Sequence, residues 1–491
     1  MKKRILGVIL TVAMVISLLA VIPLTVSADG DTFDASADTV IITTDADMAA
    51  FAAAVTGGTT FAGKTVKLAA DVALNTTVGA TSSKPFSGNF DGQGHTVTIT
   101  QTLENPDGLG GMISFVRVPE DGTVTIQNVH VTGTITASST SSNKGYFAPL
   151  VSCFDAGLSG TGGTLNFTNC RSSVRIDLSG SQWKAVGGLV AFPRHQDGLK
   201  PLTINIDSCL WDGIINSGPA LTASGGLLGF TGENRVGRTL TVNITNTVAA
   251  GTIMLNTHYS DDVGMIVGYA KGSNSSDETA KVTLNVTDVL STGVMTFNPD
   301  VEFDNTKSIG IFGDVNGTTE LNATNFYYNA FIRGETFNSA CPLTGNTTAE
   351  HVTSTNVAAK TAAEFAALTS ADFTNATKWT FKAADATNAY IPCPASLAPA
   401  EGWIDLLKTD APAPVNSSEE EENTTEATDN TTAAPTTTEA PATTDALATT
   451  EPVTTEKPKK KGCGSSIGAA AAIVLVTAIF GGAAIFRKKE D

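Results

Sequence analysis

Two short stretches of the sequence, Gly187-Gly-Leu-Val-Ala-Phe192 and Gly225-Gly-Leu-Leu-Gly-Phe230, are nearly identical and begin 38 residues apart. Related stretches occur before and after them. Their third residues are Met112, Leu150, Leu189, Leu227, Met265 and Ile311, and the successive steps are 38, 39, 38, 38 and 46 residues. A nearly fixed period of this size is typical of a repeat protein in which each copy forms one structural unit.

A second motif follows each copy of the first, for example Leu165-Asn-Phe-Thr-Asn169 and Val242-Asn-Ile-Thr-Asn246. Apolar and polar residues alternate in it, which predicts a strand with one buried face. The six copies end at Asn128, Asn169, Ser208, Asn246, Asp288 and Asn325. Because Asn readily adopts turn conformations, this position predicts a structural ladder of turn residues whose amides satisfy backbone groups.

Several copies add a third short segment, such as Gly213-Ile-Ile215 and Gly251-Thr-Ile253. Three short strands per repeat, in a fixed order, predict one coil of an all-β, right-handed parallel β-helix, which is a solenoid. Stacked coils bury one continuous apolar face, with neighbouring strands about 4.8 Å apart. In this register Leu189, Leu227 and Met265 stack inside the core.

The same register places Cys170 and Cys209 at equivalent positions of neighbouring coils. Strand-aligned side chains point in parallel, so we expect two stacked buried thiols rather than a bridge, although the spacing is within disulfide range. Cys153 takes the position of Phe192, which predicts a small core residue. Cys341 and Cys393 lie outside the repeats and are the better disulfide candidates in an exported protein, with free thiols as the alternative.

The repeats span residues 60–334, and the flanking segments are expected to cap them. Residues 29–59 form the N-terminal cap, with a helix over Asp45–Val55 and Asp45 as its candidate N-cap. Residues 335–403 form the C-terminal cap, with a helix over Ala362–Leu368. Such caps hide the open strand edges at the two ends of a solenoid.

The two ends of the chain predict export and membrane attachment. Residues 1–28 carry a basic start, an apolar run and a small-residue cleavage site, as in a signal peptide; an uncleaved anchor is the alternative. Residues 404–461 are rich in Thr, Pro and Glu and are expected to form a disordered stalk. Residues 467–486 contain no charge and are long enough to span a bilayer, and residues 487–491, which begin with three basic residues, would stay in the cytoplasm.

A lone cysteine precedes the predicted span. Cys463, in Lys461-Gly-Cys-Gly464, resembles a small motif of some bacterial sorting tails, which would make it a site of processing or lipidation. The alternative is an incidental juxtamembrane cysteine. The sequence contains no LPxTG wall-sorting motif.

One further segment carries a family resemblance. Phe90-Asp-Gly-Gln-Gly-His95-Thr-Val97, followed by the repeated Gly-Gly-Leu motifs, resembles bacterial cell-surface proteins with GLUG-type repeats over about residues 60–330. The resemblance implies a right-handed parallel β-helix. In such proteins the repeats accompany adhesins and some surface peptidases and are not themselves catalytic.

Composition and spacing give little support for chemistry. The formal charge of -18 argues against nucleic-acid binding, and 5 His and 6 Cys residues without CxxC spacing leave no metal or cofactor site. The acidic pairs Glu120-Asp121, Asp261-Asp262 and Asp277-Glu278 share no repeat position and are expected in solvated loops. His95 is the most notable single residue, but no nucleophile or acidic partner is evident for it. HExxH and GxSxG are absent.

These features favour a membrane-anchored surface display protein, exported with its ectodomain outside. We expect adhesin-like, non-catalytic binding of a glycan, a host or matrix surface, or a surface protein ligand. Two alternatives remain open at this point. One is a carbohydrate-active β-helix enzyme, a polysaccharide lyase or hydrolase, which needs clustered acids or a Lys or Arg base. The other is a structural surface-layer component.

Overall fold

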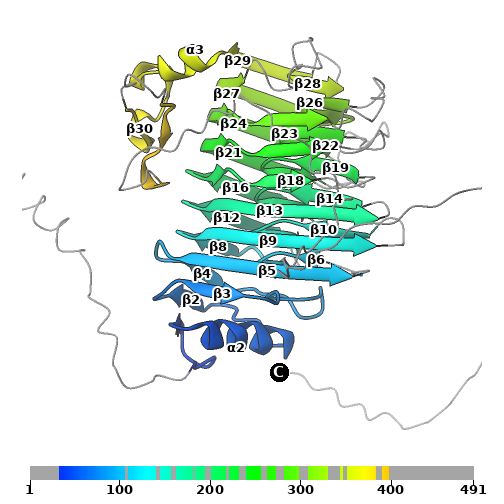
Figure 1. Cartoon of the computed structure of the whole chain (residues 1–491), viewed down its shortest axis with the longest axis vertical. Coiled ribbons are helices and arrows are strands. Elements are labelled where there is room, and N and C mark those ends of the chain that lie inside the picture. Colours follow the sequence, from blue (N-terminus) through cyan, green and yellow to red (C-terminus); the bar gives the residue numbers. More distant parts are fainter. Residues whose placement is uncertain are drawn as a thin grey trace, which may run out of the picture. The chain divides into compact units, whose positions relative to one another are not determined.

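The alternating segments of the second motif form strands that pair in parallel, coil upon coil (Figure 1). In chain order they are β8 (Thr123–Gln127), β12 (Gly163–Thr168), β16 (Leu202–Asp207), β21 (Thr239–Ala249), β24 (Lys281–Ser291) and β27 (Thr319–Asn329). Leu165 lies opposite Val124 on one side and Ile204 on the other, so equivalent repeat positions stack directly. The chain is therefore mostly β and forms a parallel β-solenoid, as predicted.

The computed structural model describes residues 33–104, 109–139, 144–155, 162–180, 183–193, 201–216, 221–231, 239–255, 262–272, 281–297, 308–329, 343–346, 351–382 and 390–397. All of them belong to one compact unit, residues 1–419. The predicted signal peptide, stalk, membrane span, cytoplasmic tail and Cys463 lie outside these residues. Within the described part of the chain, no helix combines the length and apolarity needed to cross a membrane.

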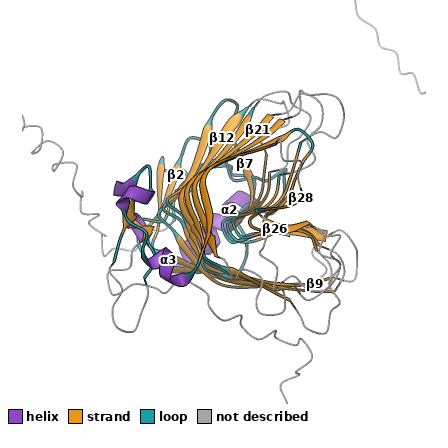
Figure 2. Cartoon of the chain, turned by 90° about the horizontal axis from the view of Figure 1, so that it is seen from above, coloured by secondary structure: helices purple, strands orange, loops and turns teal. Residues whose placement is uncertain are grey.

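The strands surround one apolar interior on three sides (Figure 2). The strands of the second motif belong to one sheet, which we call the first sheet. The third motif adds to this sheet the strands β9 (His130–Ser139), β13 (Arg171–Gly180), β17 (Leu210–Trp211), β18 (Ile214–Asn216), β22 (Thr252–Leu255) and β25 (Val294–Phe297). The second sheet contains β6 (Leu109–Gly110), β7 (Ile113–Arg117), β10 (Lys144–Phe147), β11 (Val151–Asp155), β14 (Trp183–Gly187), β15 (Val190–Pro193), β19 (Leu221–Gly225), β20 (Leu228–Phe230), β23 (Asp262–Lys271) and β26 (Ser308–Asn316).

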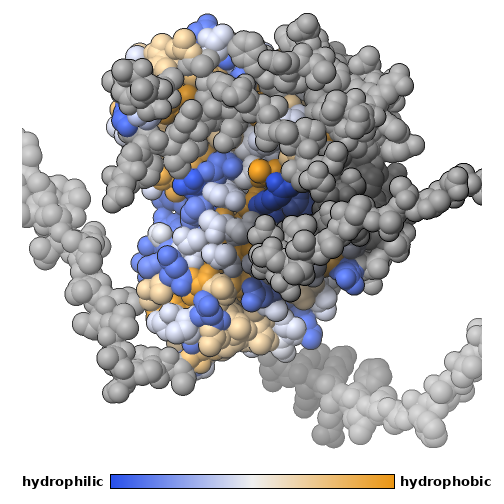
Figure 3. Space-filling model, viewed as in Figure 1, coloured by the Kyte–Doolittle hydropathy of each residue, from blue (hydrophilic) through white to orange (hydrophobic). Residues whose placement is uncertain are grey.

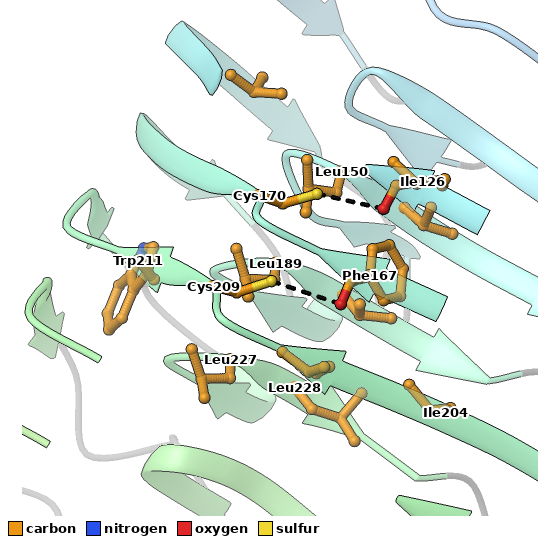
Figure 4. Close-up of a cluster of buried hydrophobic side chains, with 14 of the residues drawn as sticks. Ile126, Leu150, Phe167, Cys170, Leu189, Ile204, Cys209, Trp211, Leu227 and Leu228 are labelled. Atoms are coloured by element: carbon orange, nitrogen blue, oxygen red, sulfur yellow. Dashed lines mark hydrogen bonds between the residues drawn. The ribbon is translucent and has the colours of Figure 1, made fainter. Parts of the chain in front are cut away.

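The Gly-Gly pair of the first motif is required by a tight corner of the second sheet. A Cβ atom on Gly225 would lie 1.9 Å from the carbonyl oxygen of Leu228, which no real side chain tolerates. The third residue of the motif then turns inward. Leu189, Leu227 and Met265 are completely buried, and Leu150, Leu189 and Leu227 follow one another along the interior (Figure 4). The predicted core column is confirmed.

The parallel pairing starts before residue 60. β1 (Thr39–Ile42) pairs with β2 (Thr65–Leu68), which leads to β3 (Val72–Leu74), β4 (Asn89–Asp91) and β5 (Thr96–Glu104). Helix α2 (Asp45–Thr56) buries Met48 and Phe51 at this end, where apolar residues gather on the visible surface (Figure 3). Its N-cap is Thr44 and not Asp45, because the Thr44 hydroxyl accepts from the Asp47 amide while the Asp47 carboxylate accepts from Thr44.

The pairing also continues beyond residue 334. β28 (Thr344–Asn346) and β29 (Val352–Lys360) add to β26 and β27 in parallel. The chain then forms α3 (Ala362–Ala366), η3 (Ser370–Asp372), η4 (Ala376–Lys378), β30 (Trp379–Thr380), β31 (Cys393–Pro394) and η5 (Ala395–Leu397). We name the described residues 361–382 and 390–397 the strap. Phe365, Trp379 and Cys393 of the strap pack on Leu210 and Tyr327 of the first sheet.

Of the predicted C-terminal cap, β28 and β29 extend the end of the solenoid, and the strap covers its side. The reason is a row of apolar side chains on the outer surface of the first sheet, at positions where most outward residues are polar. Leu210, Val248, Leu290 and Tyr327 form this row, one per coil, and all are buried. The predicted helix at 362 is confirmed but ends at Ala366.

The four described cysteines are buried, and no two of them form a disulfide. Cys170 and Cys209 lie in neighbouring coils, and their thiols donate to the carbonyl oxygens of Ile126 and Phe167, as Figure 4 shows. Burial raises the pKa of Cys209 well above its usual value, and the neighbouring Cys170 adds to the rise. The predicted stacked thiols are confirmed. Cys153 is buried and lies opposite Phe192 of β15. Cys341 lies outside the described residues, so its pairing with Cys393 stays a prediction.

Candidate binding site at the solenoid corner

A column of residues in the left-handed conformation forms one corner of the solenoid. Its members are Asn128, Asn169, Ser208, Asn246, Asp288, Asn325 and Asn356, with φ between 48 and 56°. Asn and Asp tolerate this conformation better than other side chains, which confirms the predicted turn ladder. The amides bond mainly to neighbouring side chains, however, and not to the backbone as expected. Asn169 Nδ2, for instance, donates to Asn128 Oδ1 at 3.1 Å.

Two carboxylates along this corner hold the strap. Asp288 is fully buried and accepts from the backbone amides of Thr374 and Asn375 at 2.9 and 2.8 Å, and from Asn325 Nδ2 at 2.9 Å. Asp207 accepts from Lys378 Nζ at 3.2 Å. Burial alone would raise the pKa of Asp207, but hydrogen bonds from Asn246, Thr245 and Lys378 outweigh it and lower that pKa. Asp288, a departure from Asn in the column, and Asp207, which precedes the column residue Ser208, therefore anchor the strap.

The side chains two residues after the corner column are polar where the strap ends and apolar beneath it. Under the strap they are apolar, but the next two coils place Arg171 and His130 at the same position. A pocket of about 490 Å³ opens there. Its walls come from three coils and from the end of the strap: Gln93, Gly94, Asn128, Val129, His130, Asn169, Arg171, Ser396 and Leu397.

A polar network supports the wall of this pocket. His130 Nε2 lies 2.9 Å from Ser173 Oγ, and Ser173 Oγ donates to Asp212 Oδ1 at 2.5 Å. Arg171 donates to both carboxylate oxygens of Asp212, through Nε at 3.4 Å and Nη2 at 2.5 Å. Burial lowers the pKa of His130 to about 4, and the nearby Arg171 contributes to the lowering. His130 is therefore a neutral imidazole at physiological pH.

The order of these groups does not form a nucleophilic triad. In a Ser-His-Asp triad the imidazole lies between the other two groups and removes the serine proton. Here Ser173 lies in the middle, and its hydroxyl donates a hydrogen bond to Asp212. The neutral His130 therefore donates to Ser173 through Nε2–H and keeps an acceptor lone pair on Nδ1. Ser173 has no base. Arg171 is a permanent cation and is no base either.

His95, the residue singled out from the sequence, lies one coil before His130. Its Nδ1 is 3.2 Å from Asp71 Oδ1, and that carboxylate also accepts from the Thr96 amide. The backbone amide of His130 donates to the His95 carbonyl oxygen. The turn before His95 supplies Gln93 and Gly94 to the pocket, whereas His95 itself is not among the lining residues.

The acidic pairs do not contribute to this site. Glu120 and Asp121 are exposed in the turn before β8. Asp262 is buried at the start of β23, so its predicted place in a solvated loop is wrong. Asp261, Asp277 and Glu278 lie outside the described residues. Among the residues that the structure describes, no three His, Cys, Asp or Glu side chains are grouped closely enough to hold a metal ion.

A row of aromatic rings on the second sheet is a weaker candidate site. Tyr146, Phe192, Phe230 and Tyr269 lie in successive coils, with centroid distances of 4.4, 5.3 and 4.8 Å. The first two pairs are stacked within 12° of parallel. The ring faces are therefore turned toward one another, and the faces that a sugar ring would stack on are used within the row. We interpret it as packing between coils.

The comparisons with known proteins leave the function open. No protein-family model matches the chain, and no curated protein matches it. A solved structure described as a "putative immunoglobulin A1 protease from Bacteroides ovatus" is similar, at 16% identity and a TM-score of 0.44. The match covers 73% of this chain and 92% of that one. The chain is a parallel β-solenoid by its own strand pairing, and its relationship to GLUG-type repeat proteins stays a prediction.

Proposed function

We propose that this chain is a membrane-anchored surface display protein whose right-handed solenoid binds a glycan or a surface protein ligand without catalysis. The observation that carries the proposal is the corner pocket. It is walled by amide, imidazole, guanidinium and hydroxyl groups, and the His130–Ser173 contact that supports its wall has the wrong order for catalysis. Such a site supports binding better than bond cleavage.

The architecture around the pocket supports display. Each coil pairs with the next through backbone hydrogen bonds and through side-chain ladders on the outer face. A second ladder runs through Asn166, Asn205, Asn243, Asn285 and Asn322, with amide contacts of 2.8–3.0 Å. These contacts stiffen the solenoid, and residues 404–461 have the composition of an extended stalk between it and the proposed span at 467–486.

A binding and turnover experiment tests the proposal. The full chain is purified in a detergent without a sugar head group and applied to an array of glycans and extracellular matrix proteins. The same preparation is incubated with soluble polysaccharides, and new reducing ends and unsaturated products are measured. We expect saturable binding and no turnover. Turnover of any polysaccharide would establish an enzyme, and an empty array would favour a structural surface-layer component.

A further inference from the structure

The lining of the corner pocket carries five polar groups that the protein leaves open to a ligand. They are Gln93 Oε1, Asn169 Oδ1, His130 Nδ1, Arg171 Nη1 and Ser396 Oγ. None of them has a hydrogen-bond partner among the described residues, and none belongs to the buried unsatisfied atoms. They are therefore open to solvent, and their residues line a pocket whose volume lies within the range of roughly 300–1,000 Å³ that is usual for small-molecule sites.

The balance of donors and acceptors restricts the ligand. Gln93, Asn169 and His130 offer acceptors, Arg171 offers N–H donors, and the Ser396 hydroxyl can do both. A carboxylate or phosphate accepts only and would leave the three acceptors unpaired. An ammonium group donates only and would meet the guanidinium of Arg171. Hydroxyl groups donate and accept, so a ligand with several hydroxyls satisfies all five groups.

The charges around the pocket also favour a neutral ligand. Asp212 neutralises Arg171, while Asp91 bonds to the lining residues Gln93 and Asn128, and Asp71 lies next to His95. The carboxylates outnumber the cations, so an anionic ligand is repelled. Leu397 adds apolar surface on which the carbon skeleton of a sugar can rest.

We propose that the corner pocket is a saccharide-binding site that takes one or two neutral sugar units, and that the strap completes it through Ser396 and Leu397. This inference rests on the proposed binding function and names its site and its ligand class. The strap is thereby part of the binding surface as well as a cover for the apolar row.

The test measures affinity by saturation-transfer NMR and calorimetry on the full chain in the same detergent. The probes are neutral trisaccharides of glucose, mannose, galactose and xylose, with trigalacturonate and spermidine as charged comparisons. His130→Ala removes an acceptor, and Ser396→Trp fills the pocket from the exposed strap. Thr134→Ala is the matched control, because Thr134 also faces outward from β9 but lies outside the pocket.

We expect at least one neutral trisaccharide to bind, with an affinity loss of about tenfold or more in both pocket variants and none in Thr134→Ala. A thermal melt of each variant shows whether it is folded. If His130→Ala melts at a lower temperature than the wild type, the affinity of Ser396→Trp alone tests the inference. Binding of trigalacturonate or spermidine in preference to neutral sugars would overturn the inference. So would array binding that both pocket variants leave intact, although the proposed function would then stand. An empty array would overturn both.

Discussion

Replacing Asp288 by Asn should loosen the strap without disturbing the solenoid. The substitution preserves the size of the side chain, and its backbone conformation suits Asn, because Asn128, Asn169, Asn246 and Asn325 adopt it in other coils. What changes is the charge. The carboxylate that accepts from the amides of Thr374 and Asn375 becomes a carboxamide with one acceptor oxygen and an NH₂ group.

The expected loss follows from these two contacts. Hydrogen bonds to a charged group contribute about 1.5–3 kcal/mol each, and the carboxamide oxygen can retain one of them in weaker form. The strap should therefore lose about 2–4 kcal/mol against local detachment. This corresponds to an increase of about 30- to 700-fold in the population of the detached strap. The core is untouched, since Asp288 lies on the outer corner.

Hydrogen–deuterium exchange measures this population directly. Peptides that cover residues 365–380 should exchange faster in Asp288→Asn by about that factor, while peptides of β12 and β16 keep their protection. Fluorescence of the buried Trp379 should shift toward the solvent-exposed value. Asp38→Asn, the same change at an exposed position near the N-terminal end, is the control. Unchanged exchange of residues 365–380 in Asp288→Asn would refute the anchoring role of the carboxylates.

Three other predictions concern the core, the pocket and the tail. Leu227→Asp buries an unpaired charge, so several neighbouring coils should unfold, and a wild-type melting curve would argue against the register. The pKa of His130 is about 4 in the folded chain, whereas that of an unfolded His is about 6.5. As the pH falls, the unfolded chain therefore protonates this imidazole first. The free energy of unfolding should fall by up to about 3 kcal/mol between pH 6.5 and 4. Urea titrations should show a smaller fall in His130→Gln, and an equal fall would exclude His130 as the cause. Deleting everything after Lys461 should release the ectodomain into the medium. In the undeleted protein, an intact mass that corresponds to a C-terminus near Gly462 would indicate processing at Cys463, and a mass that corresponds to a C-terminus at Asp491 would indicate a retained anchor.

The repeat itself was accessible from the sequence because its determinants are local. Alternating residues assign the strands, the Gly-Gly pairs mark the corner, and the fixed period stacks Leu189 on Leu227. The position of the strap on the side of the solenoid was not predicted, because its partners are spread over several coils. The signal was present in Leu210, Val248 and Leu290, which are apolar at a position where polar residues were expected. Asp288 gave a second signal, as a carboxylate in a column of amides.

The binding site was not predicted, for a related reason. His130 and Arg171 each follow a turn residue and have no distinctive spacing in one dimension. They become neighbours only through the parallel register, and the strap reaches them from more than 200 residues further along the chain. His95 was singled out by its glycine-rich turn, yet it is that turn, through Gln93 and Gly94, that lines the pocket. A systematic search of each repeat position for departures from its column would have found these residues.

Attachment of whole cells tests the central claim most directly. Cells that carry the full chain are allowed to settle on a surface coated with the ligand that the array selects, and the force needed to detach them is measured under flow. We predict that cells carrying the Ser396→Trp variant detach like cells without the protein, at equal surface levels, while cells carrying Thr134→Ala hold as firmly as wild type. Equal attachment of the Ser396→Trp and wild-type cells would contradict the account.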